Sequence, residues 1–476
     1  MYEEAQEKSC PRVVICGLRG GSGKTIATLG LTGALRQRGL SVAPFKKGPD
    51  YIDPQWISLA ANSPCRNLDL FLMSQDEIRH SILQYGSVSD IAVIEGNRGL
   101  YDGMDEEGTY STAELAIQIE APVILVVDCT KATRTIAALV LGCKLLNPKT
   151  PLRGVILNQV ASERQESVIR RAVEQDTGIP VLGSIRKKRN FSFPERHLGL
   201  YPPSEQGSPQ GILQQITEWF EDSVDVEAII NIAQSAPQIK CDERHIEAKK
   251  KRNDKEQIRI GLIRDEAFHF YYPENIEILE KGNAEIVEIN SMKDKCLPEI
   301  DGLYIGGGFP EVYGNQLSEN RVFRQNLYDE INSGLPVLAE CGGLIYLSKA
   351  VVYQGCTYDM AGVFPVTYNI STKPQGHGYT IVRVDQENPF CSVGTLMSGH
   401  EFRYSQVTEN EYDMADAVFE MKRGYGFDGT KDGLIFKNCV ASFCHHHAAG
   451  NPELLMGLLR LAQERKLNLI ESKPGS

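Results

Sequence analysis

A cysteine set between an apolar run and two glycines is the first feature of this sequence that could do chemistry. The stretch "PVLAECGGLIYL" (336–347) places Cys341 after a β-type segment and before a helical one. Such a turn lifts a nucleophile out of a sheet, and a helix N-terminus favours the thiolate. A thiolate also needs a base, and three histidines, residues 445–447, follow a second apolar run. The sequence therefore predicts a cysteine–histidine pair.

A glycine-rich segment supplies the third part of such a site. In "YIGGGFPEVYG" (304–314), a β-type run leads into three glycines. Backbone N–H groups in such a loop can stabilise an oxyanion, and we assign this role to Gly307 and Gly308. Each feature alone has another explanation, because a histidine triplet is often a surface turn or an adventitious metal binder, and Cys-Gly-Gly is often structural.

A second constellation, near the front of the chain, is suited to phosphate. "GLRGGSGKT" (17–25) follows a β-type run and opens a helix, so its unpaired N–H groups would face an anion. Gly21, Gly23, Lys24 and Thr25 are the predicted ATP ligands, and the Thr25 hydroxyl would also bind Mg²⁺. Gly17 precedes Gly23 by one residue more than the usual motif, so a chance glycine turn is the alternative.

Carboxylates follow the next apolar runs, in "FKKGPDYIDP" and "IEGNRGLYDG". In an open parallel sheet, such residues gather at the carboxyl ends of the strands, where ligands bind. The acids expected to hold Mg²⁺ or the substrate are Asp50, Asp53, Glu95 and Asp102. Each taken singly could instead be a helix cap or a solvated loop acid.

Three further polar residues follow these runs. Lys46 and Lys47 could contact phosphate or an anionic substrate, or could be surface lysines. Asn158 lies where an amide could contact the adenine edge of ATP.

The elements that must position these residues alternate between β-type runs and helical stretches, which indicates two α/β domains with mostly parallel sheets. Residues 1–239 form the predicted phosphate-loop domain, 240–257 a charged linker, and 258–476 the second domain. Residues 350–430 show few helical periods and predict antiparallel strands. The expected strands are 12–16, 41–45, 91–95, 122–128, 153–160, 258–264, 284–289, 302–308, 336–341 and 434–443.

Composition narrows the class of partner. The net charge of −12 disfavours nucleic acid or an anionic membrane, so small-molecule partners are expected. The 12 cysteines form no CxxC pair, which suits reduced thiols. No apolar run is long enough to span a bilayer, and the acidic start is unlike a secretory signal, so we expect a cytoplasmic protein. A homodimer is compatible with the sequence.

Taken together, these stretches resemble the cobyrinic acid a,c-diamide synthase family. The matching segments span nearly the whole chain: "GGSGKT", "PFKKGPDYIDP", "IEGNRGLYDG", "PERHLGL", "AFHFYYPEN", "GGGFPE", "ECGGLIYL", "GHEFRYS" and "ASFCHHHAAGNP". The resemblance implies a P-loop synthetase domain similar to dethiobiotin synthetase, followed by a class I glutamine amidotransferase domain. It implies ATP, Mg²⁺, L-glutamine and a tetrapyrrole polycarboxylate as ligands.

The resemblance also implies roles for single residues. Asp50, Asp53, Glu95 and Asp102 would organise Mg²⁺ and the activated carboxylate, Cys341 would be the glutaminase nucleophile, and His445 its base. His447 stands where other triad amidotransferases place an orienting glutamate, so it is the candidate third member, and that assignment is open. His446 is not expected to be catalytic.

Departures from the family pattern leave the substrate open. Leu18, Arg19 and Gly20 replace a Thr-Ser-Ser loop, while Arg98 and Arg403 are added basic residues that suggest a pocket for many carboxylates. The resemblance implies amidation of the a and c acetates of cobyrinic acid in cobalamin biosynthesis. Amidation of sirohaem or nickel-sirohydrochlorin is the alternative with the same chemistry, and a nucleotide-dependent metal-delivery or binding module is the alternative of another class.

Overall fold

The computed structural model describes residues 10–187, 195–196, 199–239 and 257–471. By their internal contacts the residues form two compact units, Met1–Lys249 and Lys250–Ser476. The predicted linker, 240–257, lies outside the described residues except for Gln257, and the predicted domain limits stay predictions. None of the helices in the described part of the chain has the length and apolar character needed to cross a membrane.

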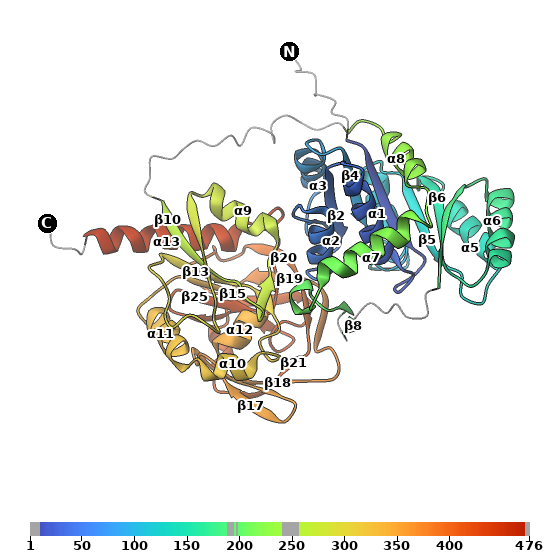
Figure 1. Ribbon diagram of the computed structural model, residues 1–476. Helices are drawn as coiled ribbons and strands as arrows, with labels where there is room; N and C mark the ends of the chain where they lie inside the picture. The colour runs from blue at the N-terminus through green and yellow to red at the C-terminus, as the bar shows by residue number, and fades with distance from the viewer. Residues whose placement is uncertain (1–9, 188–194, 197–198, 240–256, 472–476) are drawn as a thin grey trace, which may run out of the picture. The chain divides into compact units, whose positions relative to one another are not determined.

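The first unit is built on a seven-stranded sheet in the order β3-β2-β4-β1-β5-β6-β7. Figure 1 labels β2, β4, β5 and β6 of this sheet. All of its neighbouring strands pair in parallel. The predicted strands are confirmed, because their apolar runs are buried on both faces. The strands are β1 Arg12–Gly17, β2 Val42–Lys47, β3 Arg66–Leu68, β4 Ile91–Glu95, β5 Val123–Asp128, β6 Leu152–Val160 and β7 Val181–Arg186.

Helices join these strands and cover the sheet. One face packs against α1, α7 and α8, whose Leu31, Phe220 and Ile229 are buried in a common core. The order of the strands puts β1 between β4 and β5, so the loop after β1 lies at the centre of the sheet's carboxyl edge. The helices are α1 Lys24–Gln37, α2 Asp53–Ala61, α3 Gln75–Ser81, the π-helix η1 Ile82–Gly86, α4 Thr112–Gln118, α5 Thr135–Leu146, α6 Glu163–Thr177, α7 Pro209–Glu221 and α8 Val226–Gln234. The short elements β8 Glu195–Arg196, β9 Gly199–Leu200 and η2 Pro203–Glu205 precede α7.

The second unit has a six-stranded sheet in the order β12-β10-β13-β15-β25-β24. Its strands are β10 Ile258–Ile263, β12 Ala284–Ile289, β13 Gly302–Ile305, β15 Val337–Glu340, β24 Leu434–Phe436 and β25 Cys439–Ser442. The expectation of one strand over 434–443 is wrong. This segment is a hairpin, in which β24 pairs antiparallel with β25 around Lys437, whose φ is 54°.

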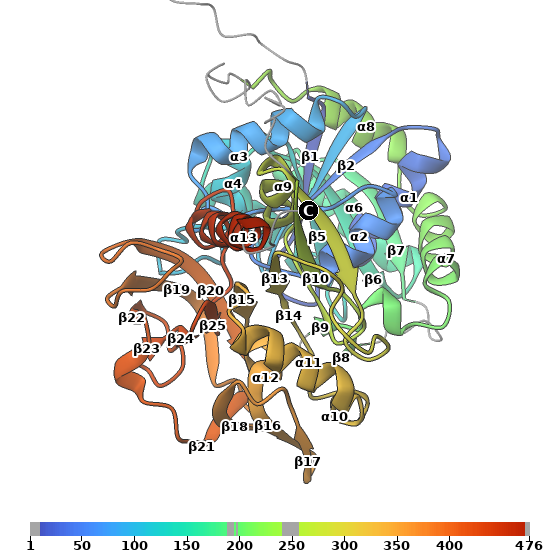
Figure 2. The same cartoon turned by 90° about the vertical axis from the view of Figure 1, so that its left-hand side faces the viewer.

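Helices pack on both faces of this sheet. Leu458 of α13 and Leu279 of α9 are buried against one face, and Phe323 of α11 and Leu344 of α12 against the other. Figure 2 shows α13 and α12 within this unit from a second direction. The helices are α9 Pro273–Lys281, α10 Gly314–Glu319, α11 Arg321–Asn332, α12 Gly342–Leu347 and α13 Glu453–Glu471. A two-stranded antiparallel sheet, β11 Phe268–Phe270 with β14 Gly307–Gly308, follows the ends of β10 and β13.

Between α12 and β24 the chain forms two four-stranded sheets, β17-β16-β18-β21 and β20-β19-β22-β23. The predicted antiparallel strands are confirmed for most pairs, although β16 and β18 pair in parallel. The elements are β16 Ser348–Tyr353, β17 Cys356–Asp359, β18 Phe364–Ile370, β19 Gly376–Val384, β20 Leu396–Arg403, β21 Ser405–Asn410, the 3₁₀ turn η4 Met414–Asp416, β22 Phe419–Arg423 and β23 Lys431–Asp432.

Candidate active sites

The phosphate loop connects β1 to α1, and side chains at the start of α1 contact the loop and the end of β4. Gly21 and Gly23 have φ angles of 72° and 93°, which other residues rarely adopt. The buried Lys24 extends its Nζ to the carbonyl of Arg19 (3.3 Å), so its ammonium lies over the loop. The Thr25 hydroxyl donates to Glu95 Oε1 (2.9 Å) at the end of β4. Lys24 and Thr25 therefore lie together at the carboxyl edge of the sheet.

Asn158 anchors this loop. Its Nδ2 donates to the carbonyl of Ser22 (2.9 Å), and its Oδ1 accepts from the amide of Gln159 (2.9 Å). A Cβ at Gly23 would collide with the Asn158 amide, so the glycine is needed for this approach. The structure thus gives Asn158 a role in holding the loop, and its predicted contact with adenine stays a prediction.

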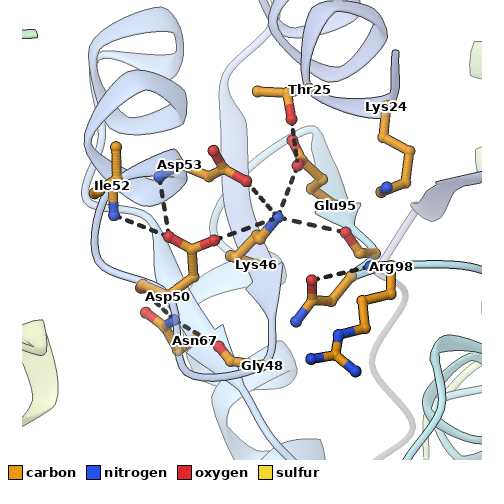
Figure 3. A network of polar contacts seen from close by, with 12 residues as sticks. Lys24, Thr25, Lys46, Gly48, Asp50, Ile52, Asp53, Asn67, Glu95 and Arg98 are labelled. Atoms are coloured by element: carbon orange, nitrogen blue, oxygen red, sulfur yellow. Dashed lines mark hydrogen bonds and ion pairs between the residues drawn. The ribbon is translucent and has the colours of Figure 1, made fainter. Parts of the chain in front are cut away.

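Three of the four acids predicted beside the loop, Asp50, Asp53 and Glu95, surround a buried lysine (Figure 3). Lys46 Nζ, at the end of β2, donates to Asp53 Oδ2 and Glu95 Oε1, both at 2.7 Å, and lies 3.8 Å from Asp50 Oδ2. The Asp50 carboxylate in turn accepts from the amides of Ile52 (2.9 Å) and Asp53 (3.1 Å), which fixes the start of α2. The structure therefore brings Thr25, Asp50, Asp53 and Glu95 together with Lys46 at their centre.

Charge compensation explains the ionisation of this cluster. Burial opposes the ammonium of Lys46, but the charges of Asp53, Glu95 and Asp50 outweigh it and raise its pKa well above the usual value. Burial and the charge of Asp53 raise the pKa of Asp50 to about 7. Burial would raise the pKa of Asp53, but the ion pair with Lys46 lowers it. The three carboxyl groups thus converge on a single ammonium, that of Lys46.

The cluster has the donor chemistry that Mg²⁺ requires. Carboxylate and hydroxyl oxygens are its preferred ligands, and Glu95 Oε2 is buried without a hydrogen-bond partner. Within the described ranges, no three acidic, histidine or cysteine side chains are arranged to hold a metal ion, since the acids converge on Lys46 instead. The oxygen donors are thus of the kind that Mg²⁺ takes, and the Lys46 ammonium occupies the centre between them in this structure.

The remaining predicted substrate residues of the first unit follow β4. Arg98 is exposed and has a φ of 48°, and its amide is held by Asn97 Oδ1 (2.9 Å). Asp102 Oδ2 accepts from the amide of Gly99 (2.8 Å), so its carboxylate closes this loop while remaining exposed. Lys47, in contrast, is the last residue of β2; it is buried, and burial lowers its pKa.

Cys341 occupies the sharp turn predicted between β15 and α12. Its φ and ψ are 49° and −98°, an unusual conformation for a residue with a side chain. A Cβ at Gly342 would lie 2.9 Å from the amide nitrogen of Gly308, and one at Gly343 would lie 2.6 Å from the carbonyl oxygen of Ile305. The two glycines therefore let this turn approach the glycine loop after β13, and the predicted oxyanion donors lie beside the nucleophile.

His445 is brought to Cys341 by the loop after β25. Its side chain is hydrogen-bonded to Cys341, and this bond is one of the causes that raise the pKa of His445. The imidazole is 2% exposed, stacks on His400 of β20 with ring centroids 4.9 Å apart, and exchanges backbone hydrogen bonds with that residue. A Cβ at Gly307 would lie 2.6 Å from His445 Cε1, so the glycine loop contacts the base as well.

The other two histidines face elsewhere. His447 Nε2 lies 3.5 Å from Glu274 Oε2, and its ring packs on Tyr272 at 4.6 Å. His446 Nδ1 is 3.1 Å from the carbonyl of Ser398. At Nδ1 of His445, the group that faces the ring is Glu340 Oε2, at 3.6 Å. The geometry therefore does not favour His447 as the third catalytic member.

Arg403 is buried, and its guanidinium is bonded within the second unit. Its side chain is 4% exposed, its guanidinium donates to the carbonyls of Ser405 and Gly426, and it lies 4.0 Å from the centre of the Phe443 ring. These contacts do not favour the predicted role of Arg403 in binding substrate carboxylates, which stays a prediction.

Several residues at these sites are not predicted by the sequence patterns. Asp432 is fully buried and accepts from the Ser442 hydroxyl (2.9 Å) and the Phe443 amide (3.1 Å), which holds the end of β25. His400 and Glu340 contact His445 from other strands. Glu340 directly precedes Cys341, and this adjacency is the one signal that could have identified it.

Comparison with known proteins places the chain in a family. The model of the CobQ/CobB/MinD/ParA nucleotide binding domain matches residues 13–200, and the CobB/CobQ-like glutamine amidotransferase domain matches 259–453. Cobyrinate a,c-diamide synthase of Magnetococcus marinus is 40% identical, covering 96% of this chain and 98% of the relative. The Archaeoglobus fulgidus protein of that name is 39% identical over the same shares. The chain belongs to the cobyrinate a,c-diamide synthase family.

The family match fixes the class of enzyme. The chain is a ligase with a nucleotide-binding P-loop domain and a glutamine amidotransferase domain, as its two α/β units indicate. Among solved structures, PurLQS from Thermotoga maritima matches with a TM-score of 0.32 and 12% identity, covering 45% of this chain and 100% of that one.

Proposed function

We propose that this enzyme uses ATP and L-glutamine to convert the a and c acetate carboxylates of cobyrinic acid into amides, in cobalamin biosynthesis. Family membership over nearly the whole chain carries the proposal, since the relatives at 40% and 39% identity bear that activity in their names. The geometry supports it, because one unit gathers a phosphate loop and acids, and the other a cysteine, a histidine and a glycine loop.

In the first unit, the task is to make a carboxylate electrophilic. The carboxylate oxygen attacks the γ-phosphorus of ATP, the bond to the bridging oxygen breaks, and an acyl phosphate and ADP result. Lys24 and the amides of Gly21 and Gly23 bind the phosphates. Thr25, Asp53 and Glu95, with Asp50 behind them, would hold Mg²⁺, which neutralises charge on the transferring group. Arg98 and Asp102 are the substrate-binding candidates on the loop after β4.

In the second unit, the task is to release ammonia. The Cys341 thiolate attacks the glutamine amide carbon, the carbon–nitrogen bond breaks, and protonated His445 gives its proton to the leaving nitrogen. Gly307 and Gly308 stabilise the oxyanion. Water then hydrolyses the thioester to glutamate, and the ammonia displaces phosphate from the acyl phosphate.

Product analysis tests the proposal. The purified chain is offered cobyrinic acid, sirohaem or nickel-sirohydrochlorin with ATP, Mg²⁺ and glutamine, and mass spectrometry counts the carboxylates converted to amides. We expect two conversions on cobyrinic acid and none when Lys24→Ala replaces the wild type, because the phosphate loses its main cationic partner.

The competing functions give different products. Amidation of sirohaem or nickel-sirohydrochlorin in preference to cobyrinic acid would identify that tetrapyrrole as the substrate. Failure to release glutamate from glutamine with any tetrapyrrole, in folded protein that binds ATP, would support the metal-delivery or binding module instead.

A further inference from the structure

Glu340 is the last residue of β15 and directly precedes Cys341. The residue is buried, with 2% exposure. A carboxylate is costly to bury unless its oxygens are bonded, and here both are. Oε2 accepts from the Tyr304 hydroxyl (2.9 Å) and Oε1 from the amide of His446 (3.2 Å). Glu340 is thus tied to the loop that carries the histidines.

The surroundings make this carboxylate rigid. Asn275 donates from Nδ2 to the Tyr304 hydroxyl (3.1 Å) and to the carbonyl of His446 (2.9 Å), and its Oδ1 accepts from the amide of Ala448 (2.8 Å). Residues of three elements, β13, β15 and α9, therefore fix the position of the Glu340 carboxylate relative to the loop that carries the histidines. Oε2 of Glu340 lies 3.6 Å from Nδ1 of His445.

We propose that Glu340 is the positioning carboxylate of the Cys341–His445 pair, facing Nδ1 of the base so that the opposite side of the ring serves the thiol. This inference rests on the proposed glutaminase role of Cys341 and His445. In this proposal Glu340 takes the place of His447 as the third catalytic member, and His447 pairs with Glu274 instead. The nucleophile and the acid that orients its base are then neighbours in the sequence, carried by the same strand end.

The electrostatics agree with this geometry. Burial disfavours protonation of His445, but Cys341 and Glu340 overcome it and raise its pKa to about 10. A negative charge at Nδ1 favours the imidazolium that protonates the leaving ammonia. The titratable groups around His445 include Cys341, Glu340, His400 and His446, and the charge of His445 is one of the causes that lower the pKa values of the two other histidines.

The test replaces Glu340 by its neutral isostere in the full chain. For Glu340→Gln we expect kcat for glutamate release to fall about 100-fold with little change in KM, since positioning acts on the transition state. Removing the charge lowers the pKa of His445, so the basic limb of the pH–rate profile moves to lower pH. The pH profile of Cys341 alkylation by iodoacetamide should shift in the same direction, and Glu340→Asp should restore part of kcat.

A matched control removes another buried carboxylate. Glu401 is 2% exposed and accepts from the amides of Tyr425 and Gly426. Glu401→Gln should lower Tm but leave both pH profiles in place. Glu274→Gln tests the competing pair. If it reproduces the loss and the shift while Glu340→Gln does not, the inference is overturned.

Two further measurements separate the possible failures. Cys341→Ala must abolish glutamate release, and if it does not, the proposed glutaminase site fails before Glu340 is in question. If Glu340→Gln does not fold, ¹⁵N NMR of histidine-labelled wild-type protein gives the answer, with His445→Gln for assignment. We expect a proton on Nδ1 of His445 throughout neutral pH, and an unprotonated Nδ1 would overturn the proposal.

Discussion

At the scale of residues, Lys46 illustrates what a linear pattern does and does not reveal. The acids after β2 and β4 are predictable, because strand ends of a parallel sheet converge. The position of the lysine is not, since the sequence equally permits a phosphate ligand or a surface residue. Its place among Asp50, Asp53 and Glu95 depends on β2, α2 and β4 meeting around one buried ammonium.

Lys46→Met should expose the mutual repulsion of these acids. Loss of one partner of a buried ion pair costs about 3 kcal/mol, so we expect a fall in Tm of several degrees in the absence of divalent ions. Because the vacated centre is lined by oxygen ligands, Mg²⁺ should raise the Tm of the variant more than that of the wild type. Thermal unfolding with and without Mg²⁺ and calorimetric titration measure both effects.

Lys47→Met is the matched control for this variant, since Lys47 is a neighbouring buried lysine with a different principal acid partner, Asp69. Its Tm should show no added response to Mg²⁺. An unchanged Tm and a wild-type response to Mg²⁺ in Lys46→Met would mean that Lys46 does not compensate the acids.

At the scale of elements, the order of strands and helices follows from the apolar runs, and so does the sharp turn at Cys341 between β15 and α12. Periodicity does not reveal that one apolar run contains two short strands. The prediction of a single strand over 434–443 therefore missed the hairpin of β24 and β25. Nor does periodicity reveal Glu340 as the acid beside His445, because that contact joins β15 to the loop after β25. Long-range side-chain contacts are set by packing, on which local patterns carry little information.

The glycine loop after β13 yields a prediction at this scale. A Cβ at Gly307 would lie 2.6 Å from His445 Cε1. Gly307→Ala should displace the base and reduce glutamate release about 100-fold, while amidation with ammonium salts continues. Gly142→Ala, in α5 with open space around its Cβ position, should change neither rate. Wild-type glutamate release by Gly307→Ala would show that the loop and the imidazole can separate without cost.

At the scale of the whole molecule, the candidate residues for each proposed chemical task belong to one compact unit. The phosphate loop and its acids come from the first unit alone, and Cys341, Glu340 and His445 come from the second. The resemblance of motifs across nearly the whole chain predicts this division. It is also economical chemically, since free ammonia at neutral pH is mostly ammonium, and a linked glutaminase supplies the unprotonated nucleophile where it is used.

This division predicts that the nucleophile can be removed without loss of the ligase reaction. Cys341→Ala should lose glutamine-dependent amidation by about 1,000-fold or more, because the second unit then offers no thiol at the turn. Ammonium salts should restore amidation, more effectively at higher pH where more ammonia is unprotonated. Lys24→Ala should be inactive with either nitrogen source. Parallel assays of amide formation with glutamine and with ammonium chloride measure both variants. If folded Cys341→Ala that still binds ATP also fails with ammonia, Cys341 must act in the synthetase step or in holding the units in a working arrangement, and the two tasks are not separable as proposed.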